Sequence, residues 1–260
     1  INNILSIKIN NDVTHIFNFC FFIILSIKIK NWLYIKTYLL WHNSKLYKFL
    51  PKPIMTIKTP FSYSHILKPT ELIKSDPEVP LNTLELYLDY GCPFCLLIFD
   101  KWKQGGFFNE DLLTKHKLQI KFVNVPQPAI LRSTPLHNVS LAVARYKPTE
   151  FWEYSLQLFK DAKETWNNNF NGNSPDEFNK ILAIHANKYT GIDIQLAYDY
   201  LSDKDEGKNR TSDLKYFIRY SRTIGVIYTP TVAINGIVVN GISSETSLEK
   251  VVEIIKQNTL

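Results

Sequence analysis

Cysteine and glycine are scarce in this 260-residue sequence, which contains three cysteines, nine glycines and one methionine. So few cysteines exclude a small domain held together by disulfides, and so few glycines exclude a collagen-like or linker-dominated chain. Apolar residues, in contrast, make up 45% of the chain, and 13% of its residues are aromatic. This content excludes a mostly disordered protein and predicts a sizeable hydrophobic core.

The first 54 residues lack glycine, alanine and arginine, and they carry the whole net charge of +6. They contain seven lysines and one acidic residue, whereas the rest of the chain has 23 basic and 23 acidic residues. A protein that binds nucleic acid needs a basic surface. The balanced charge after residue 54 therefore argues against nucleic acid as a partner.

Residues 1–54 are rich in Ile, Asn, Lys and Phe, the bias that A/T-rich DNA produces when it is translated. We therefore expect the protein to begin at Met55 and residues 1–54 to be a non-native or disordered leader, which predicts a cytoplasmic location. The alternative is a genuine organellar, secretory or membrane signal, since 15 uncharged residues separate Asp12 from Lys28. That run is shorter than the roughly 18–20 residues of a spanning helix, and no basic start of a signal peptide precedes it.

The next regions show the beginning of an α/β fold. Residues 55–80 contain four prolines and are predicted to be an irregular lead-in with at most a short helical piece. Residues 81–90 alternate apolar and polar side chains, which predicts a strand. An apolar-periodic helix follows and ends near Gly105, and residues 118–125 are predicted to be a second strand. The order strand, helix, strand is the start of a βαβ unit.

The spacing of apolar residues predicts helices from Leu136 to about Arg222. Pro148 divides two predicted helices. A third is predicted to begin at Ser174, because Ser174-Pro175-Asp176-Glu177 combines a serine cap with a glutamate three residues later. A shorter helix is predicted to begin at Asp193.

The strand pattern returns near the end of the chain. Residues 231–239 are predicted to form a hairpin around Asn235-Gly236, the dipeptide that tight primed turns prefer. Ser247 to Gln257 has the apolar spacing of an amphipathic terminal helix.

Two cysteines, Cys92 and Cys95, lie where the first predicted strand passes into a helix. Residues three apart in the first helical turn share one face, so the two sulfurs can form a disulfide. Unpaired N–H groups and the positive end of the helix dipole stabilise a thiolate there, and we expect the pKa of Cys92 to lie below the usual value of about 8.5. Cys95 is expected to be the less exposed thiol. The pattern predicts attack by Cys92 on a substrate disulfide, followed by resolution by Cys95.

Other interpretations of these residues stay open. A zinc site would need His116, His137 and His185 to converge on the cysteines, because the chain has no second Cys-x-x-Cys; we predict no metal site. The two cysteines could also be inert. Asp89, three residues before Cys92, is either a proton-transfer group beside the thiols or a solvated strand residue.

The segment Asp89-Tyr90-Gly91-Cys92-Pro93-Phe94-Cys95, followed by a helix, a strand, a block of helices and Thr229-Pro230 before a hairpin, resembles the DsbA-like branch of the thioredoxin superfamily. The resemblance covers roughly residues 80–260. It implies an α/β, thioredoxin-like fold, in which a mixed central sheet is flanked by helices and an all-helical subdomain is inserted. The thioredoxin-like domain would comprise residues 81–134 and 223–260, and the insertion residues 135–222.

The resemblance also implies roles for individual residues. Cys92 matches the nucleophile of the family and Cys95 the resolving cysteine. Pro230 matches the cis-proline that packs beside the disulfide, and Thr229 matches the residue whose backbone pairs with an extended substrate.

We therefore predict a thiol–disulfide oxidoreductase that uses a Cys-Pro-Phe-Cys pair on protein or small-molecule thiols and disulfides, without a cofactor. Pro93 and Phe94 complete the predicted substrate-binding residues. One alternative is a glutathione-dependent transferase or isomerase of the kappa-like kind, with glutathione as co-substrate near Thr229. Another is a redox-inactive binding protein with the same fold. The sequence predicts no particular oligomeric state.

Overall fold

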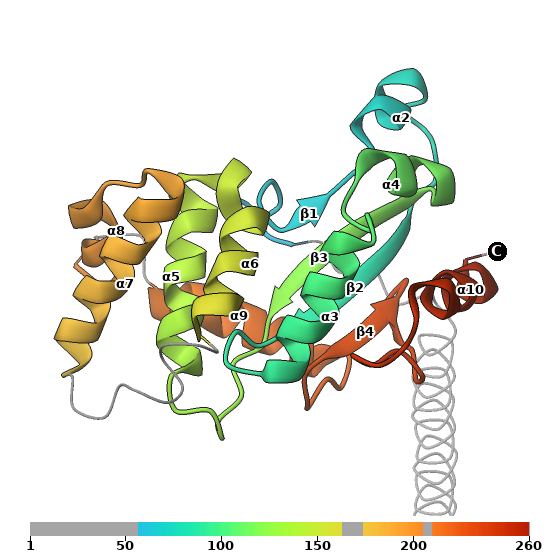
Figure 1. Cartoon of the computed structure of the whole chain (residues 1–260). Helices are drawn as coiled ribbons and strands as arrows, with labels where there is room; N and C mark the ends of the chain where they lie inside the picture. The colour runs from blue at the N-terminus through green and yellow to red at the C-terminus, as the bar shows by residue number, and fades with distance from the viewer. Residues whose placement is uncertain (1–56, 163–173, 205–209, 260) are drawn as a thin grey trace, which may run out of the picture. The chain divides into compact units, whose positions relative to one another are not determined.

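A mixed five-stranded sheet runs through the part of the chain that the computed structural model describes, residues 57–162, 174–204 and 210–259 (Figure 1). The leader predicted at residues 1–54 lies outside this part. The strand order is β1-β3-β2-β4-β5; β2 and β3 are parallel and all other neighbours are antiparallel. The strands are β1 Ile66–Leu67, β2 Asn82–Leu88, β3 Leu118–Asn124, β4 Thr231–Ile234 and β5 Ile237–Val238.

Strand β2 is the central strand, and it is buried on both faces. The alternation of leucine with Glu85 and Tyr87 is typical of a half-buried strand, but Glu85 and Tyr87 are as buried as Leu84. The Glu85 carboxylate is satisfied there because it accepts hydrogen bonds from the hydroxyls of Tyr87 (3.0 Å) and Tyr220 (2.7 Å) and forms an ion pair with Lys121 (3.3 Å). A buried charge needs such partners.

The predicted strand–helix–strand unit is present, with two additions that the sequence did not indicate, the edge strand β1 and the helix α4. The predicted irregular lead-in supplies an edge strand, β1, and a short helix, α2, so it is part of the fold. A further helix, α4, lies between α3 and β3; Asn109 precedes it, and two acidic residues occupy its first turn. The helices that accompany the sheet are α2 Thr70–Ser75, α3 Pro93–Gln104, α4 Glu110–His116, α9 Arg210–Thr223 and α10 Leu248–Asn258.

The predicted helical block follows β3. Its helices are α5 Ser133–Tyr146, a 3-10 turn at Pro148–Glu150, α6 Phe151–Asp161, α7 Pro175–Thr190 and α8 Ile194–Leu201. The predicted starts are confirmed, since Ser174 forms a complete capping box with Glu177 and Asp193 caps α8. Helix α5 contacts α6, α7, α8 and α9, while α6 packs against α3 and α9 against β3. The block and the sheet therefore belong to one compact unit, residues 54–260.

The predicted hairpin and terminal helix are also confirmed. Asn235 and Gly236 have φ values of 52° and 78°, the left-handed conformation that a primed two-residue turn requires. Asn235 is anchored to the central strand, because its backbone N–H donates to the Thr83 carbonyl and its side chain accepts from the Thr83 N–H, both at 2.8 Å. Ser247 caps α10.

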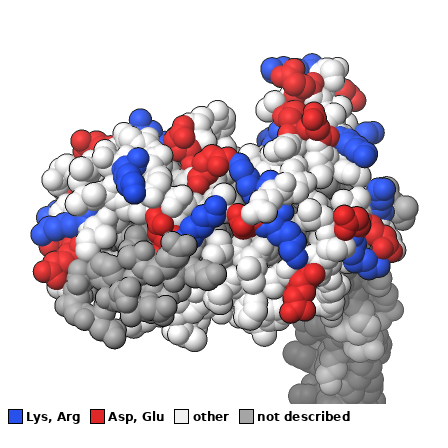
Figure 2. Space-filling view, viewed as in Figure 1, with Lys and Arg blue, Asp and Glu red and all other residues white. Residues whose placement is uncertain are grey.

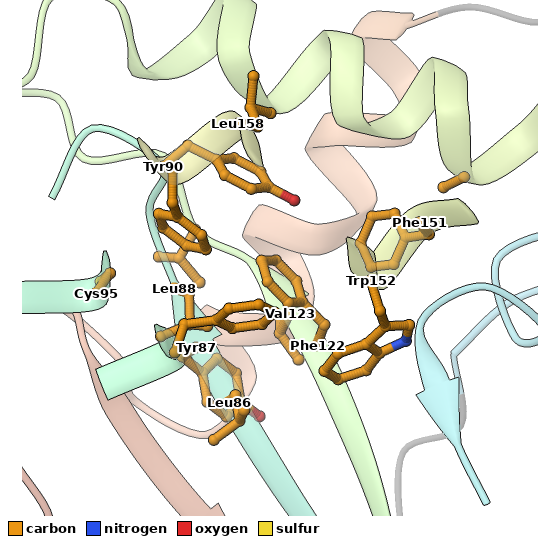
Figure 3. Packing of buried hydrophobic residues seen from close by; sticks show 14 of the residues in the cluster. Leu86, Tyr87, Leu88, Tyr90, Cys95, Phe122, Val123, Phe151, Trp152 and Leu158 are labelled. Atoms are coloured by element: carbon orange, nitrogen blue, oxygen red, sulfur yellow. The ribbon is translucent and has the colours of Figure 1, made fainter. Parts of the chain in front are cut away.

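Aromatic side chains fill the space between β3, α3 and α6 (Figure 3). Phe122 on β3 packs against Phe151 and Trp152, with ring centroids 5.3 and 6.0 Å apart. Cys95 belongs to the same buried cluster. The resolving position of the predicted redox pair is therefore embedded in the core.

The surface carries charges of both signs. On the face shown in Figure 2, lysines and arginines are interspersed with acidic residues. Within the described ranges, no helix combines the length and the apolar character that crossing a bilayer demands.

Candidate active site

The two cysteines lie at the start of α3, directly after the central strand. Cys92 is the N-cap residue in extended conformation, and Pro93 is the first helical residue, where a proline costs no hydrogen bond. Cys92 is 8% exposed and Cys95 is fully buried, so the prediction that Cys95 is the less exposed thiol is confirmed. Both are free thiols.

The environment shifts the pKa values of the two thiols in opposite directions. Hydrogen bonds from the Cys95 thiol, and from the backbone N–H groups of Cys95 and Phe94, lower the pKa of Cys92 to about 6, although burial opposes the shift. Burial raises the pKa of Cys95 well above its usual value, and its contact with Cys92 raises it further. Cys92 is therefore largely a thiolate at neutral pH, while Cys95 keeps its proton.

The loop before β4 brings Thr229 and Pro230 to this pair. The Cys92 Sγ lies 3.5 Å from the Thr229 carbonyl oxygen, although the two residues are 137 positions apart in the sequence. The Thr229–Pro230 peptide bond is cis. The structure thus brings the Thr229–Pro230 segment to Cys92, the neighbourhood that the resemblance implies for Pro230.

Asp89 is fully buried, so its interpretation as a solvated strand residue is wrong. Burial would raise the pKa of this carboxyl, but contact with His137 and hydrogen bonds from the N–H groups of Gly91 and Gln127 outweigh it and lower the pKa. These donors come from three different segments. Asp89 is therefore a buried carboxylate directly before residues 90–95, the segment from the end of β2 into the first turn of α3, which we call the redox loop.

Apolar side chains are exposed on the segments that carry the pair. Phe94, between the two cysteines, is 57% exposed, and Ile227 and Tyr228, just before Thr229, are 80% and 58% exposed. Leu131 is 87% exposed, and its neighbour Ile130 packs so closely over Gly91 that a Cβ there would meet it at 2.4 Å. An apolar rim of this kind suits an apolar partner.

The three histidines of the zinc interpretation do not converge on the cysteines. His185 contacts Asp161 (2.7 Å) and the Tyr154 hydroxyl (3.1 Å), and His137 contacts Asn124 (2.8 Å). His116 is the last residue of α4. Across residues 57–162, 174–204 and 210–259, no three metal-ligating side chains form a group.

Sequence analysis missed Ser133 and His137, both on α5, as neighbours of the redox loop. Ser133 donates to both carboxylate oxygens of Asp89 at 2.9 Å. His137 Nε2 lies 3.5 Å from Asp89 Oδ1. Their spacing of four places them on one helix face, which is a weak signal, and nothing in the sequence pairs that face with Asp89.

A family model described as Thioredoxin matches residues 77–256, a span that includes the cysteines, α5 and Pro230. The chain belongs to the thioredoxin family. No curated protein matches it. Among solved structures, it is similar to oxidised BdbD from Bacillus subtilis, with a TM-score of 0.57 and 18% identity over 76% of this chain and 94% of the other.

Two further thioredoxin-fold structures resemble the chain. DsbA from Chlamydia trachomatis matches with a TM-score of 0.52 and 18% identity, over 80% of this chain and 96% of the other. Reduced DsbA from Mycobacterium tuberculosis matches with a TM-score of 0.51 and 16% identity, over 74% of this chain and 90% of the other. The fold is therefore that of DsbA-like proteins, a mixed sheet flanked by helices, as predicted.

Proposed function

We propose that this thioredoxin-family protein is a thiol–disulfide oxidoreductase in which Cys92 is the nucleophile and Cys95 the resolving thiol. The opposite pKa shifts of two adjacent thiols at a helix start carry the proposal. A lowered pKa supplies the attacking thiolate, and a raised pKa keeps the second thiol protonated until it is needed.

The chemistry proceeds in two exchanges. The Cys92 thiolate attacks one sulfur of a substrate disulfide, a Cys92–substrate disulfide forms, and the other substrate sulfur leaves as a thiolate that takes up a proton. Cys95 then loses its proton and attacks the Cys92 sulfur, which releases the second substrate thiolate. The pair is oxidised by two electrons and the substrate is reduced; with a substrate dithiol, both steps run in reverse.

The lowered pKa of Cys92 also bears on the direction of electron flow. Stabilising the thiolate stabilises the reduced pair, which makes the disulfide a better oxidant. A pKa of about 6 lies between those of thioredoxin, about 7, and DsbA, about 3.5. These values support a pair of intermediate oxidising strength.

Protein thiols and disulfides are the substrates that the apolar rim supports best. Phe94, Tyr228 and Leu131 are exposed on the redox loop, on the loop before β4 and on the loop after β3, respectively. Such a surface can bury apolar side chains next to a substrate cysteine. Glutathione, which is small and charged, would leave most of this rim uncovered.

The test is to trap the intermediate with a disulfide-bonded protein, insulin, as substrate. All variants carry Cys20→Ser, so that the third cysteine, which lies outside the described residues, does not react. We expect Cys95→Ser to accumulate a covalent complex with an insulin chain, because attack by Cys92 proceeds and resolution does not. With dithiothreitol added to reduce the Cys92–Cys95 disulfide after each cycle, the protein that keeps both cysteines should reduce insulin repeatedly. Cys92→Ser should form no complex.

Equal turnover by the wild-type pair and Cys95→Ser would contradict the proposed mechanism, because resolution would then not depend on Cys95. That result, together with glutathione consumption, would favour a glutathione-dependent transferase or isomerase. No reaction in any variant would favour a binding protein without redox activity.

A further inference from the structure

The Asp89 side chain ties the redox loop to two other segments. Its carboxylate accepts hydrogen bonds from the N–H of Gly91 (2.9 Å) in the redox loop and from the N–H of Gln127 (2.7 Å) after β3. Helix α5 supplies the Ser133 hydroxyl, 2.9 Å from both oxygens, and His137 Nε2, 3.5 Å from Oδ1. Three of these groups donate hydrogen bonds to the carboxylate, and the fourth, His137 Nε2, lies just beyond normal hydrogen-bond distance.

The backbone of Asp89 contacts both cysteines. Its carbonyl accepts from the Cys92 N–H at 3.0 Å. Its N–H points the other way and donates to the Cys95 Sγ at 3.4 Å. Asp89, whose side chain is held by hydrogen bonds from several segments, therefore also holds Cys92 and the Cys95 sulfur through its backbone.

His137 is oriented by its own neighbours. Its Nδ1 accepts from the Asn124 amide nitrogen at 2.8 Å, and the same amide donates to Ser140 at 2.9 Å. The Asn124 oxygen faces His65 Nε2 at 2.9 Å. A neutral imidazole that accepts at Nδ1 carries its proton on Nε2. The N–H of His137 is thereby directed at Asp89.

We propose that Asp89, Ser133 and His137 are positioning residues of the redox pair: α5 holds the Asp89 carboxylate, and the Asp89 backbone holds Cys92 and the Cys95 sulfur in place for exchange. The inference rests on the proposed function, since it concerns the same two thiols. It makes α5, the first helix of the inserted block, a part of the redox site.

If Asp89 positions the redox pair, Asp89→Asn should make disulfide formation easier. If Asp89 acts only through its negative charge, the same substitution should make disulfide formation harder. An amide has one acceptor and two N–H donors, so one of the donors around Asp89 would face another donor and the loop would shift. Cys92 would then lose N–H contacts from α3, the dithiol form would be less favoured, and disulfide formation would become easier. Removing a negative charge without any shift would stabilise the thiolate and make disulfide formation harder.

The experiment measures two quantities in full-length protein with Cys20→Ser: the equilibrium constant for disulfide formation in glutathione buffers, and the titration of the Cys92 thiolate by its ultraviolet absorbance. In Asp89→Asn we expect the constant to rise about ten-fold, with the Cys92 pKa moving up by about one unit. His137→Leu should shift both in the same direction by less. His137→Gln, which retains a donor, should stay close to wild type.

The control is Asp161→Asn, which alters a second histidine–aspartate pair of the described residues, His185 with Asp161 at 2.7 Å between α6 and α7. It should leave both quantities unchanged. An unchanged or lower constant in a folded Asp89→Asn protein would overturn the inference. If that variant does not fold, equal constants for His137→Leu, His137→Gln and wild type overturn it instead. A wild-type protein that forms no Cys92–Cys95 disulfide would overturn the proposed function itself, and the inference with it.

Discussion

Cys92 differs from an ordinary thiol because of where its sulfur lies, at the start of α3 and beside a second thiol. The Cys95 thiol and two backbone N–H groups donate to it, and their combined effect on the pKa exceeds the opposing effect of partial burial. The pKa of Cys92 is lowered because hydrogen-bond donors stabilise the charged form of the thiol. Burial raises the pKa of Cys95, and its hydrogen bond to the Cys92 sulfur raises that pKa further.

The rate of Cys92 alkylation by iodoacetamide tests this difference. With Cys20→Ser as background, we expect the rate to rise with pH and to level off above a midpoint of about 6, whereas an ordinary thiol has its midpoint near pH 8.5. Cys95→Ala, which removes the first donor, should move the midpoint upward by about one unit or more. A midpoint above pH 8 in the wild-type pair would show that the helix start does not stabilise the thiolate.

At the scale of elements, the segment before β2 shows how a stretch without regular periodicity becomes part of the core. His65 lies between the rings of Phe151 and Phe217, with centroids 4.1 and 4.7 Å away. Its Nε2 faces Asn124 on β3. Complete burial lowers the pKa of His65 to about 3, so the segment is attached through a histidine that stays neutral in the fold.

That histidine makes stability depend on pH. Between about pH 6.5 and pH 3 the unfolded chain binds a proton at His65 and the folded chain does not, so the free energy of unfolding falls as the pH falls. The contribution is about 1.4 kcal/mol per pH unit within that window. In urea titrations between pH 7 and pH 4, we expect His65→Gln to lose stability less steeply than wild type. His116→Gln on α4 should reduce the slope by less, because burial lowers the pKa of His116 less than that of His65. Parallel pH profiles for wild type and His65→Gln would show that His65 is protonated in the folded state.

The elements that sequence analysis predicted correctly carry strong local signals. The capping box at Ser174, the Asn235-Gly236 turn and the apolar run into Cys92 each encode their geometry within a few residues. Strand β1 has only two residues and helix α4 only seven, which is too short for periodicity to appear. β1 forms because its backbone pairs with the edge of β3. The two residues of β1 carry no sequence signal for that pairing.

At the scale of the whole molecule, the candidate site consists of residues far apart in the sequence. The local sequence was enough to identify the two cysteines and the Thr229-Pro230 dipeptide. Their contact through the Thr229 carbonyl needed the antiparallel pairing of β2 with β4. Asp89 was singled out, but its burial depends on α5 packing over the redox loop. His137 was considered only as a metal ligand, because no local feature connects it with a carboxylate on another element.

The central claim is that Cys92 and Cys95 form a redox-active pair, and the most direct measurement is a titration of the Cys20→Ser protein in buffers of reduced and oxidised glutathione. We expect one two-electron transition, in which both thiols disappear together and mass spectrometry detects a Cys92–Cys95 disulfide without bound glutathione. Two thiols that stay free under oxidising conditions, or a protein that ends as a stable glutathione adduct on Cys92, would contradict the claim.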